Sequence, residues 1–131
     1  MKTTVDNWLD MHSKQLRKVG INSARLDCFV LLEHVLAKDR TWLIAHMEFT
    51  LEDHHLNRLN TLVAQRFKHT PLAYIVGSKE FYGREFLVNN DVLIPRPESE
   101  AIIELLMRFS ETHEINTVID IGTGSGCLAI T

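Results

Sequence analysis

A glycine-rich segment near the C-terminal end of the chain constrains its fold more than any other feature. Residues 117–121 form an apolar run that includes Val118, Ile119 and Ile121, and three alternate glycines follow it. Continuous apolar character predicts a buried strand of a parallel sheet. The glycines let a ligand approach main-chain N–H groups, and the helix predicted from Cys127 adds unpaired donors. The segment therefore predicts the opening of a nucleotide- or cofactor-binding α/β domain.

The spacing within this segment leaves the ligand open. The motif has the form Asp120-x-Gly122-x-Gly124-x-Gly126. A flexible Gly/Ser turn is the plain alternative, and the apolar strand that ends in an aspartate argues against it. Residues 124–129 also fit a G-x-G-x-x-A dinucleotide fingerprint. Periodicity and spacing do not decide between a nicotinamide cofactor and S-adenosylmethionine.

Composition excludes several classes of protein. The chain has 131 residues, of which 45% are hydrophobic and 24% charged, as in a soluble globular protein. A net charge of −3 does not favour nucleic-acid binding, and no apolar run approaches the ~20 residues of a membrane span. Two cysteines far apart in sequence indicate free thiols and a cytoplasmic location. We expect no metal site, because the adjacent His54 and His55 do not have metal-ligand spacing on a helix.

Helical periodicity fills the first 70 residues. Apolar side chains recur at three- and four-residue spacing, which predicts helices over about 5–19, 24–36, 41–47 and 50–67. Ser23 and Thr50 are the predicted N-terminal residues of the second and fourth helices, with Asp53 completing a weak capping box at Thr50. Each helix has one apolar face, so the four are expected to form an all-α bundle.

The pattern changes after Pro71. Alternating apolar residues over 73–77 and around 80–92 predict strands, and residues 82–85 predict a hairpin turn in which Gly83 has positive φ. Pro97 is a good first residue for a further helix. The apolar side chains of that helix are expected on its buried side, namely Ile102, Ile103, Leu105, Leu106 and Phe109.

Three stretches together resemble one family. They are Pro71-Leu-Ala-Tyr-Ile75-x-Gly77-x-x-Glu80-Phe81-x-Gly83-x-x-Phe86-x-Val88, then Val92-Leu-Ile-Pro95-Arg96-Pro97-Glu98-Ser99-Glu100, and the Asp120 loop. With Ser23-Ala-Arg-Leu-Asp27 before a Leu-rich helix, they resemble the release-factor glutamine methyltransferases of the HemK/PrmC family over nearly the whole chain. Ser99 stands where the family usually has Thr. The family's Asn-Pro-Pro-Tyr motif does not occur in these 131 residues.

The resemblance implies a function and a set of residues. It implies a class I methyltransferase that uses S-adenosylmethionine to methylate the glutamine side chain in the Gly-Gly-Gln motif of peptide chain release factors. The residues that would line the cofactor are Gly122, Thr123, Gly124, Ser125 and Gly126. Asp120 would fix the loop. The residues that would border the active site are Arg96, Pro97, Glu98, Ser99 and Glu100. No catalytic residue is assigned here, so the 131 residues alone are expected to be inactive.

The sequence therefore predicts three parts. Residues 1–70 are a helical domain that recognises the substrate, and residues 71–95 are a β-hairpin linker. Residues 96–131 are the start of an α/β Rossmann-like methyltransferase domain, truncated after its first strand. The expected partners are release factors, with no direct nucleic-acid or membrane partner. The alternatives are a stand-alone helical interaction module, a fragment of a nicotinamide-dependent oxidoreductase, and an adenine N6 methyltransferase.

Overall fold

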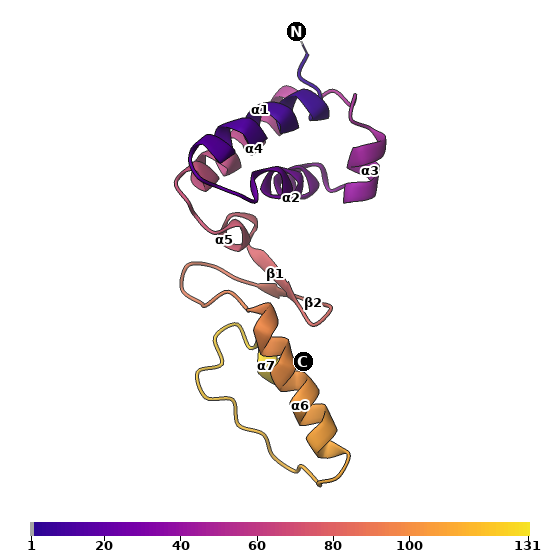
Figure 1. Ribbon diagram of the computed structural model, residues 1–131, viewed down its shortest axis with the longest axis vertical. Coiled ribbons are helices and arrows are strands. Elements are labelled where there is room, and N and C mark those ends of the chain that lie inside the picture. The colour runs from indigo at the N-terminus through magenta and orange to yellow at the C-terminus, as the bar shows by residue number, and fades with distance from the viewer. Residues whose placement is uncertain (1) are drawn as a thin grey trace. The chain divides into compact units, whose positions relative to one another are not determined.

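The computed structural model describes residues 2–131, and the chain divides into two compact units, Met1–Val76 and Gly77–Thr131. The first unit is helical, and the second contains a two-stranded hairpin with helices after it (Figure 1). The helical part with a hairpin therefore agrees with the predicted architecture. The functional division at residues 70 and 95 stays a prediction about what each part does.

The first unit is built from helices that share one core. They are α1 (Val5–Lys18), α2 (Ala24–Leu36), α3 (Arg40–Ala45), α4 (Asp53–Phe67) and the short α5 (Leu72–Val76). Helix α2 packs against both α1 and α4. The residues that fill the core include Trp8, Leu9, Leu16, Leu31, Leu32, Leu43 and Leu59. One apolar face per helix is thus enough to enclose a core, as the sequence predicts.

Helix α4 begins later than predicted. Thr50 does not start it, because Thr50 forms an antiparallel bridge with Thr4, and the Leu51 N–H donates to the carbonyl of Thr3 at 2.9 Å. An extended residue in such a bridge is outside the helix. The helix start is formed instead by Glu52 and His55 in a capping-box arrangement, in which the Glu52 N–H donates to His55 Nδ1 at 3.4 Å.

The strand predicted over 73–77 is wrong, because residues Leu72–Val76 form α5. The N–H groups of Tyr74 and Ile75 donate to the carbonyl of Pro71 at 3.0 and 3.2 Å. Ile75 is buried in the core of the first unit. The apolar residues that predict a strand therefore belong to one short helix, of which only Ile75 is fully buried, and Gly77, with φ of +83°, follows its end.

The hairpin itself is confirmed. Strands β1 (Ser78–Phe81) and β2 (Arg84–Leu87) pair antiparallel, with Phe81 opposite Arg84 and Ser78 opposite Leu87. The turn is Tyr82–Gly83, which is shorter than predicted because Arg84 already belongs to β2. Both turn residues have positive φ, +51° and +73°, as a two-residue turn between right-twisted strands requires.

The helix after Pro97 forms, but its apolar face is mostly uncovered. A 3-10 turn η1 (Pro97–Ser99) leads into α6 (Glu100–Ser110). Ile103 is buried against Phe81 and Phe86 of the hairpin. The other four side chains predicted to be buried are exposed: Ile102, Leu105, Leu106 and Phe109. That prediction is wrong for these four because within the second unit the hairpin covers only the side of α6 that carries Ile103.

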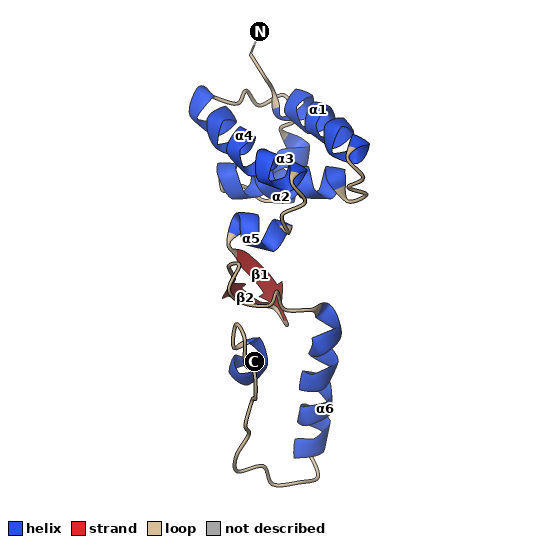
Figure 2. Cartoon of the chain, turned by 90° about the vertical axis from the view of Figure 1, so that its left-hand side faces the viewer, coloured by secondary structure: helices blue, strands red, loops and turns tan. Residues whose placement is uncertain are grey.

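The buried strand predicted over 117–121 is not formed either. These residues are irregular (Figure 2), and the apolar side chains among them are exposed, with Val118, Ile119 and Ile121 at 63%, 79% and 92% exposure. A strand needs a neighbour to pair its backbone, and among residues 2–131 the one sheet is the hairpin. The helix predicted after the glycines is confirmed as α7 (Cys127–Ile130). The Rossmann-like fold stays a prediction.

Candidate functional site

The glycine loop has the backbone conformation that its sequence predicts. Gly122, Gly124 and Gly126 have φ values of +79°, +57° and +78°, a region that side chains with a Cβ rarely adopt. Gly126 precedes α7, and its N–H donates to the carbonyl of Thr123 at 2.9 Å. A Cβ at Gly126 would lie 3.0 Å from Cδ1 of Ile130. Glycine at this position thus allows both the loop conformation and the close approach of α7.

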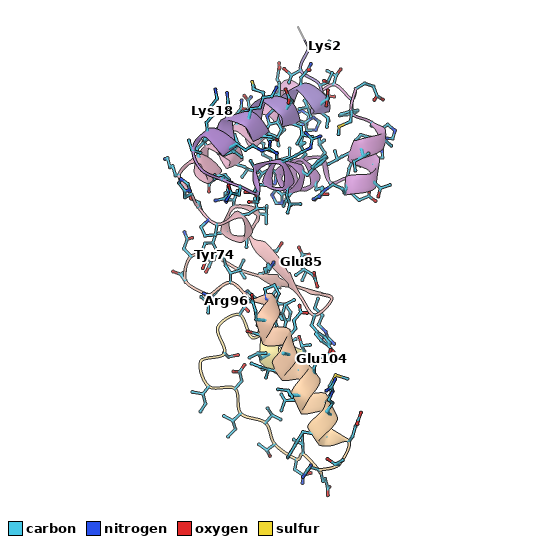
Figure 3. All side chains as sticks on the ribbon, in the orientation of Figure 1. Lys2, Lys18, Tyr74, Glu85, Arg96 and Glu104 are labelled. Carbon is cyan, nitrogen blue, oxygen red and sulfur yellow. The ribbon has the colours of Figure 1, made fainter. Side chains whose placement is uncertain are left out.

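A hollow of about 140 Å³ lies beside this loop, within the second unit. One wall comes from the loop and the other from the segment before α6. The residues predicted from the sequence that line it are Arg96, Ser99, Gly122, Thr123, Gly124 and Ser125. Two segments separated by more than 20 residues in the sequence therefore meet at one hollow. Arg96, which Figure 3 labels, comes directly before the 3-10 turn η1.

Several predicted residues lie outside the lining, and several lining residues were missed. Pro97, Glu98, Glu100, Asp120 and Gly126 do not line the hollow. The missed residues are Leu93, Ile94, Pro95, Cys127 and Leu128. A signal for three of them was present, because Leu93 to Pro95 directly precede Arg96 and an apolar run beside a polar anchor is typical of a ligand pocket. The other two begin α7.

Two polar atoms in the loop region have no hydrogen-bond partner among the described residues. Oδ2 of Asp120 and Oγ of Ser125 are both buried. Buried polar groups in native proteins are nearly always hydrogen-bonded, so such atoms are candidates for contacts with a ligand. Ser125 lines the hollow, and its hydroxyl could donate to the carboxylate of S-adenosylmethionine or accept from the ammonium and ribose hydroxyl groups of this cofactor. The residues present therefore fit part of this cofactor. The hollow is smaller than the ~300–1,000 Å³ of a complete small-molecule pocket.

The acidic residues beside Arg96 have other partners or none. Within residues 2–131 Arg96 forms no ion pair with Glu98 or Glu100. Oε1 of Glu100 instead accepts the N–H of Tyr82 in the hairpin turn at 2.9 Å. Arg96 is exposed, so its guanidinium is available to an anionic group.

Two titratable groups outside the hollow, His12 and Cys28, are buried in the first unit. His12 is buried in the first unit, and desolvation lowers the pKa of its imidazole. Burial also raises the pKa of the Cys28 thiol to about 11, which makes it an inert thiol.

Cys28 and Cys127 are free cysteines. Within residues 2–131, no group of three His, Cys, Asp or Glu side chains is arranged to hold a metal ion. None of the helices described is both long and apolar enough to cross a bilayer.

Comparison with known proteins places these features in a family. Residues 7–77 match the family model described as the PrmC N-terminal domain. A release factor glutamine methyltransferase of Buchnera aphidicola is 37% identical over 96% of the chain, which covers 45% of that protein. A protein of the same name from Mycoplasma mycoides is 35% identical over 99% of the chain, again covering 45% of its length. A bifunctional methyltransferase of Rickettsia bellii is 30% identical over 99% of the chain, which covers 28% of it.

The chain spans less than half the length of these curated relatives. The match to the family model nevertheless extends over more than half of the chain itself and includes all of α2 to α5. The relatives align beyond it, through the hairpin and the glycine loop. The chain therefore belongs to the HemK/PrmC family of methyltransferases, of which it contains the N-terminal portion.

Proposed function

We propose that the protein to which these residues belong methylates the side-chain amide of glutamine in the Gly-Gly-Gln motif of peptide chain release factors. The observation that carries this proposal is the alignment of nearly the whole chain, glycine loop included, with proteins named release factor glutamine methyltransferase. The fold supports it, because the chain has a helical unit followed by a hairpin and a glycine loop beside a hollow.

The cofactor in this proposal is S-adenosylmethionine, which supplies an electrophilic methyl group when bound. Gly122 to Ser125 would contact it through their main-chain groups, and Gly126 would keep the loop close to α7. Asp120, which precedes the glycines and does not line the hollow, would fix the loop. Arg96 and Ser99 would border the cofactor on the opposite wall. A nicotinamide dinucleotide is disfavoured, because the relatives that align through this loop are named as methyltransferases.

The residues of this chain would bind and orient rather than react. An amide nitrogen is a poor nucleophile because its lone pair is delocalised into the carbonyl. Alignment of that nitrogen with the methyl donor, together with hydrogen bonds that orient the amide, supplies proximity and electrostatic stabilisation. The printed sequence contains no Asn-Pro-Pro-Tyr motif to hold the amide. We therefore expect a polypeptide of only these 131 residues to bind S-adenosylmethionine weakly and to transfer no methyl group.

The helical unit in this proposal contacts the release factor, and that partner implies a cytoplasmic location. A second candidate is a stand-alone protein-interaction role for the same unit. The observation that favours it is that α1 to α5 enclose their own core. Only the first candidate predicts a response to the cofactor.

The test has a binding part and a catalytic part. The uniformly ¹⁵N-labelled chain is titrated with S-adenosylmethionine and, separately, with a nicotinamide dinucleotide, and the amide shifts of Gly122 to Ser125 are followed. We expect movement with the first ligand only, and movement with the dinucleotide alone would contradict the proposal. The coding region beyond Thr131 is then read for Asn-Pro-Pro-Tyr. The protein that it encodes should transfer labelled methyl to a release factor and not to its Gly-Gly-Ala variant.

A further inference from the structure

The hairpin turn contains a residue in an unfavourable backbone conformation. Tyr82 has φ of +51°, in the left-handed region where Asn, Asp and Gly are the usual residues of such turns. A non-glycine residue there is disfavoured, because its Cβ lies too close to the following carbonyl oxygen. Such a conformation persists where the surroundings determine it from several sides.

Two carboxylates of α6 surround Tyr82. Its N–H donates to Oε1 of Glu100 at 2.9 Å, and its hydroxyl donates to Oε1 of Glu104 at 3.0 Å. Glu100 and Glu104 are four residues apart and therefore lie on the same face of the helix. The hydrogen bond to Glu104 is also the main reason why the pKa of the Tyr82 hydroxyl is raised. Figure 3 labels Glu104 on this helix.

The rest of the turn agrees with this arrangement. The Gly83 N–H donates to Oε1 of Glu80 at 2.7 Å, so both amide groups of the turn bind carboxylates. Phe81 and Phe86, on either side of the turn, pack on Ile103 of the same helix. The hairpin thus contacts α6 through an apolar cluster and through hydrogen bonds from Tyr82 to two glutamates.

Glu100 occupies a special position among these residues. It is the first residue of α6 and follows Ser99, which lines the hollow together with Arg96. Glu100 does not line the hollow itself. A shift of its backbone would move Ser99 directly, because the two residues are adjacent and the Ser99 N–H is bonded to the Arg96 carbonyl at 3.0 Å. Glu104 lies one helical turn farther from the hollow wall.

We propose that Glu100 is a positioning residue: by accepting the Tyr82 N–H it holds the hairpin turn on the first turn of α6 and so sets the Arg96–Ser99 wall of the hollow. The effect on cofactor binding rests on the function proposed above, whereas the effect on the wall does not. A charge-assisted hydrogen bond of this kind is among the stronger single contacts in a protein.

The experiment compares the ¹⁵N-labelled chain with Glu100→Ala, Glu100→Gln and Glu104→Ala. Glu100→Ala removes the acceptor, and we expect the Tyr82 amide to exchange with solvent about tenfold faster. The amide shifts of Arg96 and Ser99 should move as well. Glu100→Gln keeps an acceptor oxygen and should restore both readouts in large part. Glu104→Ala removes the same charge from the same helix face and should leave Arg96 and Ser99 as they are.

A titration with S-adenosylmethionine adds the functional readout. We expect Glu100→Ala to raise the dissociation constant about tenfold, whereas Glu100→Gln and Glu104→Ala should stay within about threefold. Unchanged Arg96 and Ser99 shifts in Glu100→Ala, or equal shifts in Glu104→Ala, would overturn the positioning role. If the unaltered chain gives no response at the glycine loop, the proposed cofactor loses its support, and the amide shifts still decide whether Glu100 positions the wall.

Discussion

The two units of the chain differ in how completely they bury their apolar residues. In the first unit most of the large apolar side chains of α1, α2 and α4 are enclosed by one another. In the second unit most of the apolar face of α6 and the run Val118 to Ile121 are exposed. Helices satisfy their own backbone and need only a neighbouring helix, whereas a strand needs partners for both its backbone and its faces. The difference teaches that local sequence is enough to complete the first unit and is not enough for the second.

Hydrogen exchange should show the largest contrast between the units. Amides in the middle of α1 and α2 are expected to exchange at least about 10³-fold more slowly than unfolded amides, because a stable core opens rarely. Amides of 118–121 lack ladder partners and should exchange at nearly the unfolded rate. Mass spectrometry or NMR on the monomeric chain measures both. Strong protection of Val118 to Ile121 in a monomer would break the comparison.

Matched leucine truncations test the same contrast energetically. Leu32 is fully buried in α2 and Leu105 is exposed on α6. Leu32→Ala should lower the free energy of unfolding by about 3 kcal/mol, since it removes packed side-chain volume from a core. Leu105→Ala should change it by less than about 0.5 kcal/mol. Urea unfolding followed by far-UV circular dichroism reports the helices of both units, whereas the fluorescence of Trp8 and Trp42 reports the first unit alone. A cost at Leu105 equal to that at Leu32 would mean that its face is covered in solution.

A buried ion pair sharpens the description of the first unit. Nε of Arg66 on α4 donates to Oδ2 of Asp27 on α2 at 2.6 Å, and Nη1 of Arg66 donates to the Thr70 carbonyl at 3.1 Å. Asp27→Ala would leave the largely buried guanidinium of Arg66, whose side chain is 16% exposed, without its carboxylate and should destabilise the unit by about 3 kcal/mol. The control is Asp10→Ala, which breaks the exposed pair with Lys14 and should cost less than about 1 kcal/mol. Equal effects in urea unfolding would argue against burial of the Asp27 pair.

The smallest expected effect is the change in the free energy of unfolding with pH. Burial lowers the pKa of His12 in the folded unit below its ordinary value of 6.5. As the pH falls through 6.5, the unfolded chain takes up the proton first, so the free energy of unfolding decreases until the pH passes below the folded pKa. Unfolding measured between pH 8 and 5 should therefore show a decline, with small contributions from His34 and His55, whose pKa values are lowered as well. His12→Phe should reduce the slope, and an unchanged slope would assign the decline to other groups.

The predictions made from the sequence fail for different reasons in the two units. Helices α1 to α4 of the first unit were predictable because each has apolar residues at helical spacing, and only their ends differ, as at Thr50, which pairs with Thr4 instead. Residues 72–76 were misread because five residues are too few to separate a helical from an alternating pattern. The exposure of Ile102 and Leu105 was not predictable from α6 alone, since periodicity shows which face is apolar and not what covers it.

The loop backbone of the candidate site was predictable from the sequence, and the residues that line the hollow were predictable only in part. Three alternate glycines indicate a loop with positive φ wherever they occur after an apolar run, and the structure has that loop. Cys127 and Leu128 line the hollow because of the direction in which α7 continues from Gly126. The spacing of the glycines in the sequence does not specify that direction.

The sequence by itself determined helices α1 to α4 of the first unit, the hairpin with Gly83 in its turn, and the conformation of the glycine loop, because these depend on local periodicity and on backbone preferences of single residues. Only the tertiary structure decided that Arg96 and Ser99 meet the loop at one hollow, and that Tyr82 is held by Glu100 and Glu104 of α6. Such contacts join residues far apart in the chain. They depend on where packing places whole elements, and no local pattern in the sequence encodes that placement.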